Sequence, residues 1–275
     1  MKIRVLGTGT STGVPMPGCK CEVCKSTDKK NYRLRCSVFI EIQNKDVAQN
    51  LTQNPNEVIA SVLIDTATDL RHQALKFGID KIDAVLYTHI HADHIYGIDE
   101  LRSFNFINDC SIPIYASETS SNELEVKFNY AFNSNPNYEG ASPPKLTLQR
   151  INALQPFNLF GLDFLPLPVL HGKMEVFGFR VKNFAYITDC SYIPESTREQ
   201  LLGLDILIID GLRNRPHRTH FTHSQAVSEI EKISPKKSYL THLSHEIDHD
   251  RGNLALKDLT QLDVELAYDG LLFEL

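Results

Sequence analysis

The sequence His89-Ile90-His91-Ala92-Asp93-His94 places four potential metal ligands within six residues. It follows the apolar run Ala84-Val85-Leu86-Tyr87, which predicts a buried strand that ends at these ligands. Zinc, manganese and iron accept imidazole and carboxylate groups, and the end of a strand fixes the direction of such groups better than a mobile loop does. A histidine-rich polar turn is the alternative interpretation. Four ligand-type residues at this spacing favour a metal site, and one with two ions.

The composition limits the classes of partner. The chain has 275 residues, of which 42% are hydrophobic, and this is enough for a sizeable core. Its formal net charge of −6 gives no general attraction to nucleic acid or to anionic membranes. The apolar part of residues 1–7 is too short for a signal peptide, and no apolar run approaches the about 20 residues of a membrane span. We therefore expect a globular cytoplasmic protein with neither a membrane nor a nucleic acid as partner.

Short β-rich and helical segments alternate along the chain, without an internal repeat or a linker between two comparable halves. We therefore expect one α/β domain over residues 1–275. Strands are predicted at 2–6, 37–42, 61–65, 84–87, 112–115, 162–167, 176–181, 184–187, 206–209 and 238–240, and helices at 69–77, 195–202 and 224–233. Two more strands, 264–268 and 271–275, flank Asp269-Gly270, which predicts a hairpin turn.

Two segments interrupt this alternation. Residues 43–57 are polar and predict a loop inserted in a hairpin. Residues 118–145 mix Asn, Ser and Pro with aromatic residues, and predict a lid-like insertion with a helix near 123–132.

Three more potential ligands follow apolar strands. His171 follows residues 165–170, Asp189 follows 185–188 and His242 follows 239–241. A single histidine at a strand end is more often a hydrogen-bonded structural residue, but three such positions together favour ligands of the same site. Asp189 is the donor that can bridge two cations through its two oxygens. Asp65, after another strand, is expected either to hold a ligand histidine by a hydrogen bond or to form a turn.

Three cysteines cluster in Gly18-Cys19-Lys20-Cys21-Glu22-Val23-Cys24. A structural zinc site needs four sulfur or nitrogen donors, and His245, three residues after His242, can point away from the first site and supply the fourth. Three unpaired surface thiols are the alternative. The remaining cysteines, Cys36, Cys110 and Cys190, are expected to be core residues, because the six cysteines do not resemble a disulfide framework.

Taken together, these motifs resemble the metallo-β-lactamase superfamily, in which an HxHxDH motif is followed by a distant His, Asp and His. The match extends from Gly7 to Gly270 and implies a four-layer αββα sandwich. By this resemblance one metal ion is held by His89, His91 and His171, the other by Asp93, His94 and His242, and Asp189 bridges them as a catalytic residue.

Within the superfamily, three segments are similar to the PhnP-like phosphodiesterases. They are the turn Gly7-Thr8-Gly9-Thr10, the cysteine loop and Thr241-His242-Leu243-Ser244-His245. This resemblance implies a structural zinc on Cys19, Cys21, Cys24 and His245. It also implies a hydrolase that opens a small cyclic phosphate, such as phosphoribosyl 1,2-cyclic phosphate, with two zinc or manganese ions. A homodimer is left open.

Hydrolysis of a phosphodiester needs an acid as well as a nucleophile. Two cations about 3.5–4 Å apart lower the pKa of water to about 7, and the departing alkoxide needs a proton. The resemblance implies His223 as that acid, with His217 and His220 as competitors. Lys173 and Arg218 are candidates to contact phosphate oxygens, although each could also be a solvated surface charge.

Two other functions are weighed against this one. A tRNA 3′-processing endoribonuclease shares the metal motif, but the acidic balance and the absence of a basic arm argue against it. A non-catalytic zinc-binding protein would not need seven intact ligand positions.

Overall fold

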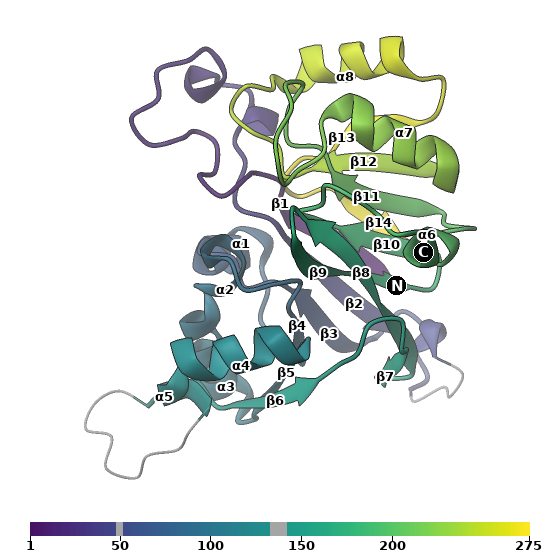
Figure 1. Cartoon of the computed structure of the whole chain (residues 1–275). Coiled ribbons are helices and arrows are strands. Elements are labelled where there is room, and N and C mark those ends of the chain that lie inside the picture. The colour runs from purple at the N-terminus through teal and green to yellow at the C-terminus, as the bar shows by residue number, and fades with distance from the viewer. Residues whose placement is uncertain (48–51, 133–141) are drawn as a thin grey trace.

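The computed structural model of the chain describes residues 1–47, 52–132 and 142–275. Two seven-stranded sheets stack face to face in this part of the chain, and helices cover their outer faces (Figure 1). This is the expected αββα sandwich. No helix within the described ranges is both long and apolar enough to cross a membrane.

The first sheet has the strand order β14-β1-β2-β3-β4-β5-β6. Its strands are β1 (Lys2–Gly7), β2 (Ser37–Gln43), β3 (Val58–Ile64), β4 (Ala84–Leu86), β5 (Ile112–Ala116), β6 (Leu146–Arg150) and β14 (Leu272–Glu274). β2 and β3 pair as an antiparallel hairpin, as predicted, and residues 48–51 of its loop lie outside the described residues.

The second sheet has the order β13-β12-β11-β10-β9-β8-β7. Its strands are β7 (Phe157–Leu159), β8 (Leu162–His171), β9 (Met174–Val181), β10 (Phe184–Ile187), β11 (Ile206–Asp210), β12 (Lys237–Thr241) and β13 (Val264–Leu266). The backbone N–H of Phe177 in β9 donates to the carbonyl of Thr88 at 2.9 Å, and thus joins the second sheet to the segment that follows β4.

Helices cover each sheet from outside (Figure 1). Those of the first half are α1 (Leu70–Phe77), α2 (Ala92–Ile95), α3 (Leu101–Asn108), α4 (Glu118–Lys127) and α5 (Asn129–Phe132), and those of the second are α6 (Glu195–Glu199), α7 (His223–Ile233) and α8 (His249–Leu259). Gly78, with φ 65°, ends α1 as expected. The predicted helix 123–132 is in fact α4 and α5, and residues 133–141 of the predicted lid lie outside the described residues.

The central strands are apolar on both faces because each sheet is covered twice. In β3, Val62 and Ile64 face the core between the sheets, whereas Leu63 packs toward the helices of the first half. In β11, Ile208 faces the inner core and Leu207 packs toward α7 and α8. Successive residues of these strands point to opposite faces, and both faces are buried. The sequence therefore shows continuous apolar runs.

The predicted hairpin at Asp269-Gly270 is wrong. β13 pairs with β12 in the second sheet, whereas β14 pairs with β1 in the first, so the dipeptide crosses between sheets. The buried Asp269 carboxylate accepts hydrogen bonds from Thr8 N, Thr8 Oγ1 and Leu34 N at 2.8–3.0 Å. Asp269 therefore lies in a turn, as predicted, but this turn anchors the N-terminal loop and joins the two sheets instead of closing a hairpin.

Candidate metal centre

Strand ends from both sheets meet at one edge of the sandwich. β10, β11 and β12 pair in parallel, and β8 runs in the same direction two strands away. His171 is the last residue of β8, Asp189 lies shortly after β10, and His242 directly follows β12. From the first sheet, the stretch His89–His94 follows β4. The topology thus brings distant parts of the sequence together.

The predicted ligands form two groups, within each of which the ligand atoms all lie within 4.8 Å of one another, and a third set at the same spacing joins Asp189 and His242 to His220. The His171 group is His89, His91, His171 and Asp189, and the His242 group is Asp93, His94 and His242. Asp189 lies between them, with Oδ2 3.8 Å from His89 Nε2 and Oδ1 3.4 Å from His242 Nε2. The predicted proximity of all seven residues is confirmed, and their roles as ligands stay predictions.

Six buried imidazole nitrogens have no hydrogen-bond partner among the described residues. Three of the six face the centre, and these are the Nε2 atoms of His89, His94 and His242. Each faces an oxygen of the Asp189 carboxylate at 3.2–3.8 Å. Because buried polar atoms are nearly always partnered, nitrogens that converge on one carboxylate fit divalent cations between them.

The electrostatics of the centre favour positive charge. Burial alone would lower the pKa of His94, but the carboxylates of Asp189, Asp65 and Asp93 together raise it well above its usual value. Burial lowers the pKa of His89 far below its usual value, so this imidazole is neutral and able to bind a metal. Three buried carboxylates around one imidazole carry a negative charge that a divalent cation would neutralise.

Hydrogen bonds on the far side of the rings hold three of the histidines, among them His89, whose Nδ1 atom lies 2.9 Å from the hydroxyl oxygen of Thr88. Asp65 accepts a hydrogen bond from Nδ1 of His94 at 2.7 Å, and two more from the N–H and hydroxyl of Thr88 at 2.8 Å each. Nδ1 of His171 donates to the carbonyl of Thr219 at 2.8 Å. These bonds leave each Nε2 atom free to face the centre. The expected hydrogen bond between Asp65 and a histidine of the motif is present, and the role of His94 as a metal ligand stays a prediction.

Three residues of the centre adopt the left-handed backbone conformation. Asp65, Asp189 and His242 have φ angles of 63°, 50° and 60°. This conformation costs about 1–3 kcal/mol at a residue other than glycine, and it persists only where the surrounding structure holds it. Each of the three follows an apolar strand, so the strained residue turns its side chain toward the edge where the groups meet.

His220, one of the competitors for the acid, lies against the centre. Its Nε2 atom is 4.0 Å from Asp189 Oδ2, and its ring stacks on that of His242 with centroids 4.5 Å apart. Its Nδ1 atom lies 2.7 Å from Asp210 Oδ2. Asp210 ends β11, so the strand-end rule that selected Asp189 would also have selected it.

His223, predicted as the acid, lies elsewhere. It is the first residue of α7, and it is 1% exposed. Burial lowers its pKa to about 4. Among the contacts in the described part of the chain, none joins the His223 ring to a residue of either group. His217, the other competitor, is exposed, with its ring centroid 5.0 Å from that of His220.

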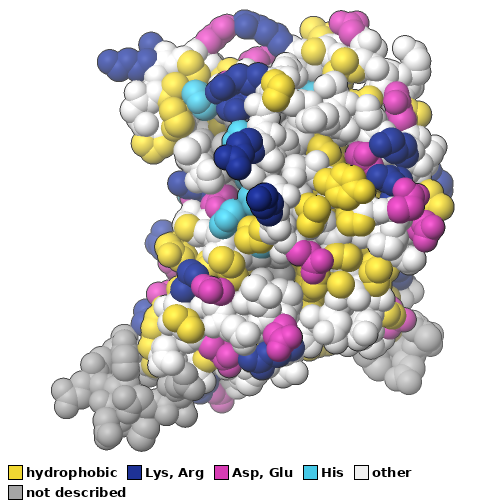
Figure 2. Space-filling model, in the orientation of Figure 1, with side chains coloured by type: hydrophobic (Ala, Val, Ile, Leu, Met, Phe, Trp, Pro, Cys, Tyr) yellow, Lys and Arg dark blue, Asp and Glu magenta, His cyan; other side chains and the backbone are white. Residues whose placement is uncertain are grey.

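The predicted phosphate-binding residues stand on the rim. Lys173 is exposed in the turn directly after His171, and Arg218 is exposed directly before Thr219, whose carbonyl holds His171. Figure 2 shows histidine side chains at the surface of this side of the molecule, with Lys and Arg side chains beside them. Their contact with a substrate stays a prediction.

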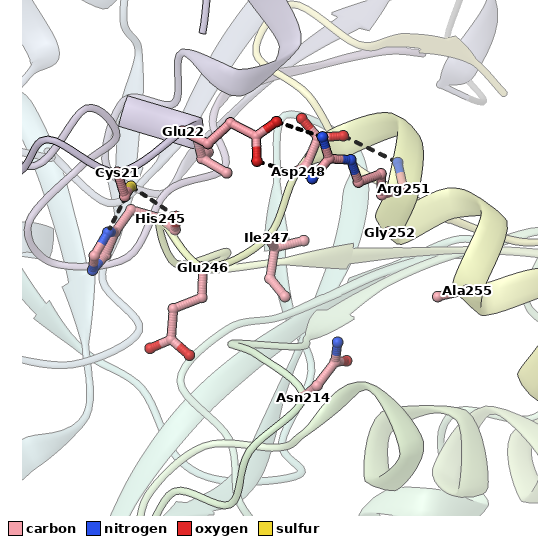
Figure 3. A pocket seen from close by; sticks show the side chains of 11 residues that line it. Cys21, Glu22, Asn214, His245, Glu246, Ile247, Asp248, Arg251, Gly252 and Ala255 are labelled. Atoms are coloured by element: carbon pink, nitrogen blue, oxygen red, sulfur yellow. Dashed lines mark hydrogen bonds and ion pairs between the residues drawn. The ribbon is translucent and has the colours of Figure 1, made fainter. Parts of the chain in front are cut away.

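The cysteine loop forms a separate group. The ligand atoms of Cys19, Cys21, Cys24 and His245 lie within 4.8 Å of one another, and we call these residues the cysteine group. The sulfurs of Cys19 and Cys21 are each 3.4 Å from Nδ1 of His245. Figure 3 shows Cys21 and His245 facing each other beside a pocket that Glu22 and Arg251 also line. The group has the four donors that a structural zinc requires.

The other cysteines are not part of this group. Cys36 and Cys190 are buried, as expected for core residues, whereas Cys110 is half-buried two residues after α3 and is not a core residue.

Comparison with known proteins shows the family. The model of the beta-lactamase superfamily domain matches residues 60–243. A solved structure described as a new diphosphatase from the PhnP family is 40% identical, with a TM-score of 0.84, and the match covers 99% of this chain and 96% of that one. Zn²⁺-bound PqqB from Methylobacterium extorquens has a TM-score of 0.75 at 18% identity over the whole of both chains, which shows a shared fold.

One curated relative is much longer than this chain. A protein of Porphyromonas gingivalis (strain ATCC BAA-308 / W83) named octanoyltransferase is 35% identical over 272 residues, which are 98% of this chain and 51% of that protein. This chain therefore spans about half the length of that relative. The superfamily model, the shared fold and the 40% identity over nearly the full length of both chains lead to one conclusion: the chain belongs to the metallo-β-lactamase superfamily and, within it, to the PhnP family.

Proposed function

We propose that this hydrolase cleaves small phosphodiesters with two divalent metal ions. The observation that carries the proposal is the position of Asp189 between two groups of imidazole and carboxylate donors, with the His220–Asp210 pair against them. The PhnP-family diphosphatase supports the same class of reaction, because it too is named for cleavage at phosphorus.

The residues of the two groups would hold the ions. The His171 group would hold one, the His242 group the other, and Asp189 would touch both. When bound, two such ions lower the pKa of water toward about 7 and offset the charge of phosphoryl oxygens. Zinc and manganese both suit these nitrogen and oxygen donors, whereas the thiolates of the cysteine group select zinc.

His220 would supply the proton that the departing oxygen needs. Asp210 accepts a hydrogen bond from Nδ1 of His220, and this fixes the tautomer and leaves Nε2 directed toward Asp189. As the acid, His220 would give up the proton at Nε2 and keep the proton at Nδ1 that Asp210 accepts. We therefore assign general-acid catalysis to His220 in place of His223. Lys173 and Arg218 on the rim would meet the remaining phosphate charge.

The proposed substrate is a cyclic phosphate of a small sugar, as the resemblance to the PhnP-like phosphodiesterases implies, and a linear diphosphate is the second candidate because of the PhnP-family diphosphatase. Octanoyl transfer is not carried over from the Porphyromonas gingivalis protein, since this chain spans only half of it.

A substrate panel tests the proposal. The full chain, loaded with zinc or manganese, is assayed on ribose 1,2-cyclic phosphate esters, linear nucleoside diphosphates, bis(p-nitrophenyl) phosphate and a precursor tRNA. We expect turnover of the small esters, two active-site metal ions per chain, and loss of turnover in His94→Ala. Cleavage of the tRNA alone would favour the endoribonuclease, and a metal-loaded chain inactive on the whole panel would favour a zinc-binding protein without activity.

A further inference from the structure

The cysteine group and the His242 group are joined by a very short segment. His242 and His245 belong to different groups, and only Leu243 and Ser244 separate them. A displacement of one histidine can therefore reach the other unless the two residues between them are held. The N–H of Ser244 donates to the carbonyl of Leu212 at 3.0 Å, and the other atoms that hold Leu243 and Ser244 come from the N-terminal part of the chain.

Leu243 is fixed by the glycine-rich turn after β1. Its N–H donates to the carbonyl of Thr8 at 2.8 Å, and its carbonyl accepts from the N–H of Thr10 at 3.1 Å. Thr8 is anchored in turn by Asp269, through its N–H and its hydroxyl. A side chain at Gly9 would have its Cβ 2.8 Å from the carbonyl oxygen of Arg33, so this position requires glycine.

Ser244 is fixed by a buried arginine. Arg33 is 1% exposed, and its Nη1 atom donates to the carbonyl of Ser244 at 3.0 Å. Its Nη2 atom donates to Asn31 Oδ1 at 3.1 Å, and Asn31 also accepts from the N–H of His249 at the start of α8. Burial lowers the pKa of Arg33 to about 10, so the side chain is still a cation at neutral pH. No carboxylate in the described part of the chain forms an ion pair with Arg33, so burying this cation is costly, and it persists where its donors are needed.

We propose that Arg33 is a positioning residue that couples the cysteine group to the His242 group. With zinc on the cysteine group, Arg33 and Thr8 hold Leu243 and Ser244 rigidly. This sets the metal affinity of the His242 group. The His171 group takes no ligand from this segment, and its affinity is expected to be independent of the cysteine group. The inference rests on the ligand sets of the proposed function. It adds that the zinc site has a role at the active site beyond holding its own loop.

Manganese binding in two single-group backgrounds tests this coupling. His91→Ala disables the His171 group, and Asp93→Ala disables the His242 group. Each full chain is stripped of metal, given one equivalent of Zn²⁺, which thiolates select, and titrated with Mn²⁺ while free Mn²⁺ is followed by electron paramagnetic resonance. Into each background we introduce Cys24→Ser or Arg33→Met, with Cys110→Ser as the matched cysteine control.

We expect both changes to weaken Mn²⁺ binding about 10- to 100-fold in the His91→Ala background, and to leave it unchanged in the Asp93→Ala background. Cys110→Ser should change neither, and Arg33→Lys, which keeps the cation and a donor, should recover part of the affinity. Equal weakening in both backgrounds, or none in either, would overturn the coupling. If Arg33→Met does not fold, Cys24→Ser decides the question. An unsubstituted chain that binds fewer than two Mn²⁺ ions would instead refute the proposed function.

Discussion

Asp65 and His94 are joined by a hydrogen bond of 2.7 Å between Oδ2 and Nδ1, and neither side chain is exposed to solvent. The carboxylate accepts from three donors in total, two of them on Thr88. Asp65, which orients His94, is thus itself held by the N–H and the hydroxyl of Thr88, just after β4.

Asp65→Asn should weaken metal binding. The amide would present its NH₂ group to at least one of the donors, so His94 would lose its hydrogen bond or Thr88 would. Loss of such a supporting bond lowers metal affinity about 10- to 100-fold. Calorimetric titration of the metal-free chain with zinc measures the effect, and Asp80→Asn, at an exposed position, is the matched control. An unchanged affinity would show that Asp65 only forms a turn.

His220→Ala should reduce kcat in a way that depends on the leaving group. General-acid catalysis contributes about 10²- to 10⁴-fold when an alkoxide departs, and little when p-nitrophenolate departs, because that anion is stable without a proton. We expect His223→Ala to retain kcat on both kinds of substrate. Metal analysis completes the experiment: the loss of one metal ion from the His220→Ala chain would make His220 a ligand rather than the acid.

His223 should make the stability depend on pH. Burial lowers its pKa from 6.5 to about 4, so the folded chain binds this proton less readily than the unfolded chain. The free energy of unfolding therefore falls as the pH drops from about 6.5 to about 4, by up to about 3 kcal/mol from this residue. Urea denaturation at pH 7 and pH 4.5 should show a smaller loss for His223→Gln than for the parent chain. Equal losses would contradict the burial of a neutral imidazole.

The cysteine group should react in a fixed order once zinc is removed. The His245 imidazole and the Cys24 N–H lower the pKa of Cys21 to about 6, whereas burial raises that of Cys24 to about 11. Iodoacetamide at pH 7.5 should therefore label Cys21 well before Cys24, since the thiolate is the reactive form. Mass spectrometry locates the label, and added zinc should protect both cysteines. Labelling of Cys24 first, or no protection by zinc, would count against the site.

The sequence predicted the neighbours of Asp189 well because one physical rule covers them. A ligand directly after an apolar strand lies at a sheet edge, and parallel strands bring such edges together. That rule does not predict the position of His220, because His220 lies ten residues beyond the end of β11 and is placed by its hydrogen bond to Asp210. Long-range hydrogen bonds of this kind leave no periodic signal in a sequence.

The errors in the predicted secondary structure have a similar origin. Asp269-Gly270 has the composition of a hairpin turn, but the donors of Thr8 and Leu34, more than 200 residues away, bind the carboxylate and separate the flanking strands into different sheets. The helices α3 and α8 were not predicted, and α8 buries only His249 and Leu256.

The hydrogen bond between Phe177 and Thr88 joins the two halves of the sandwich next to the ligand candidates. The His242 group takes residues from both halves, as does the His171 group, so cations that bind there would also bind the halves to each other. Such ions favour the folded chain by mass action, since an unfolded chain cannot present donors from both sheets at once. Bound ions would thus link the two halves of the sandwich and stabilise the folded chain. Metal supply would then set the resistance of the protein to proteolysis as well as its rate of turnover.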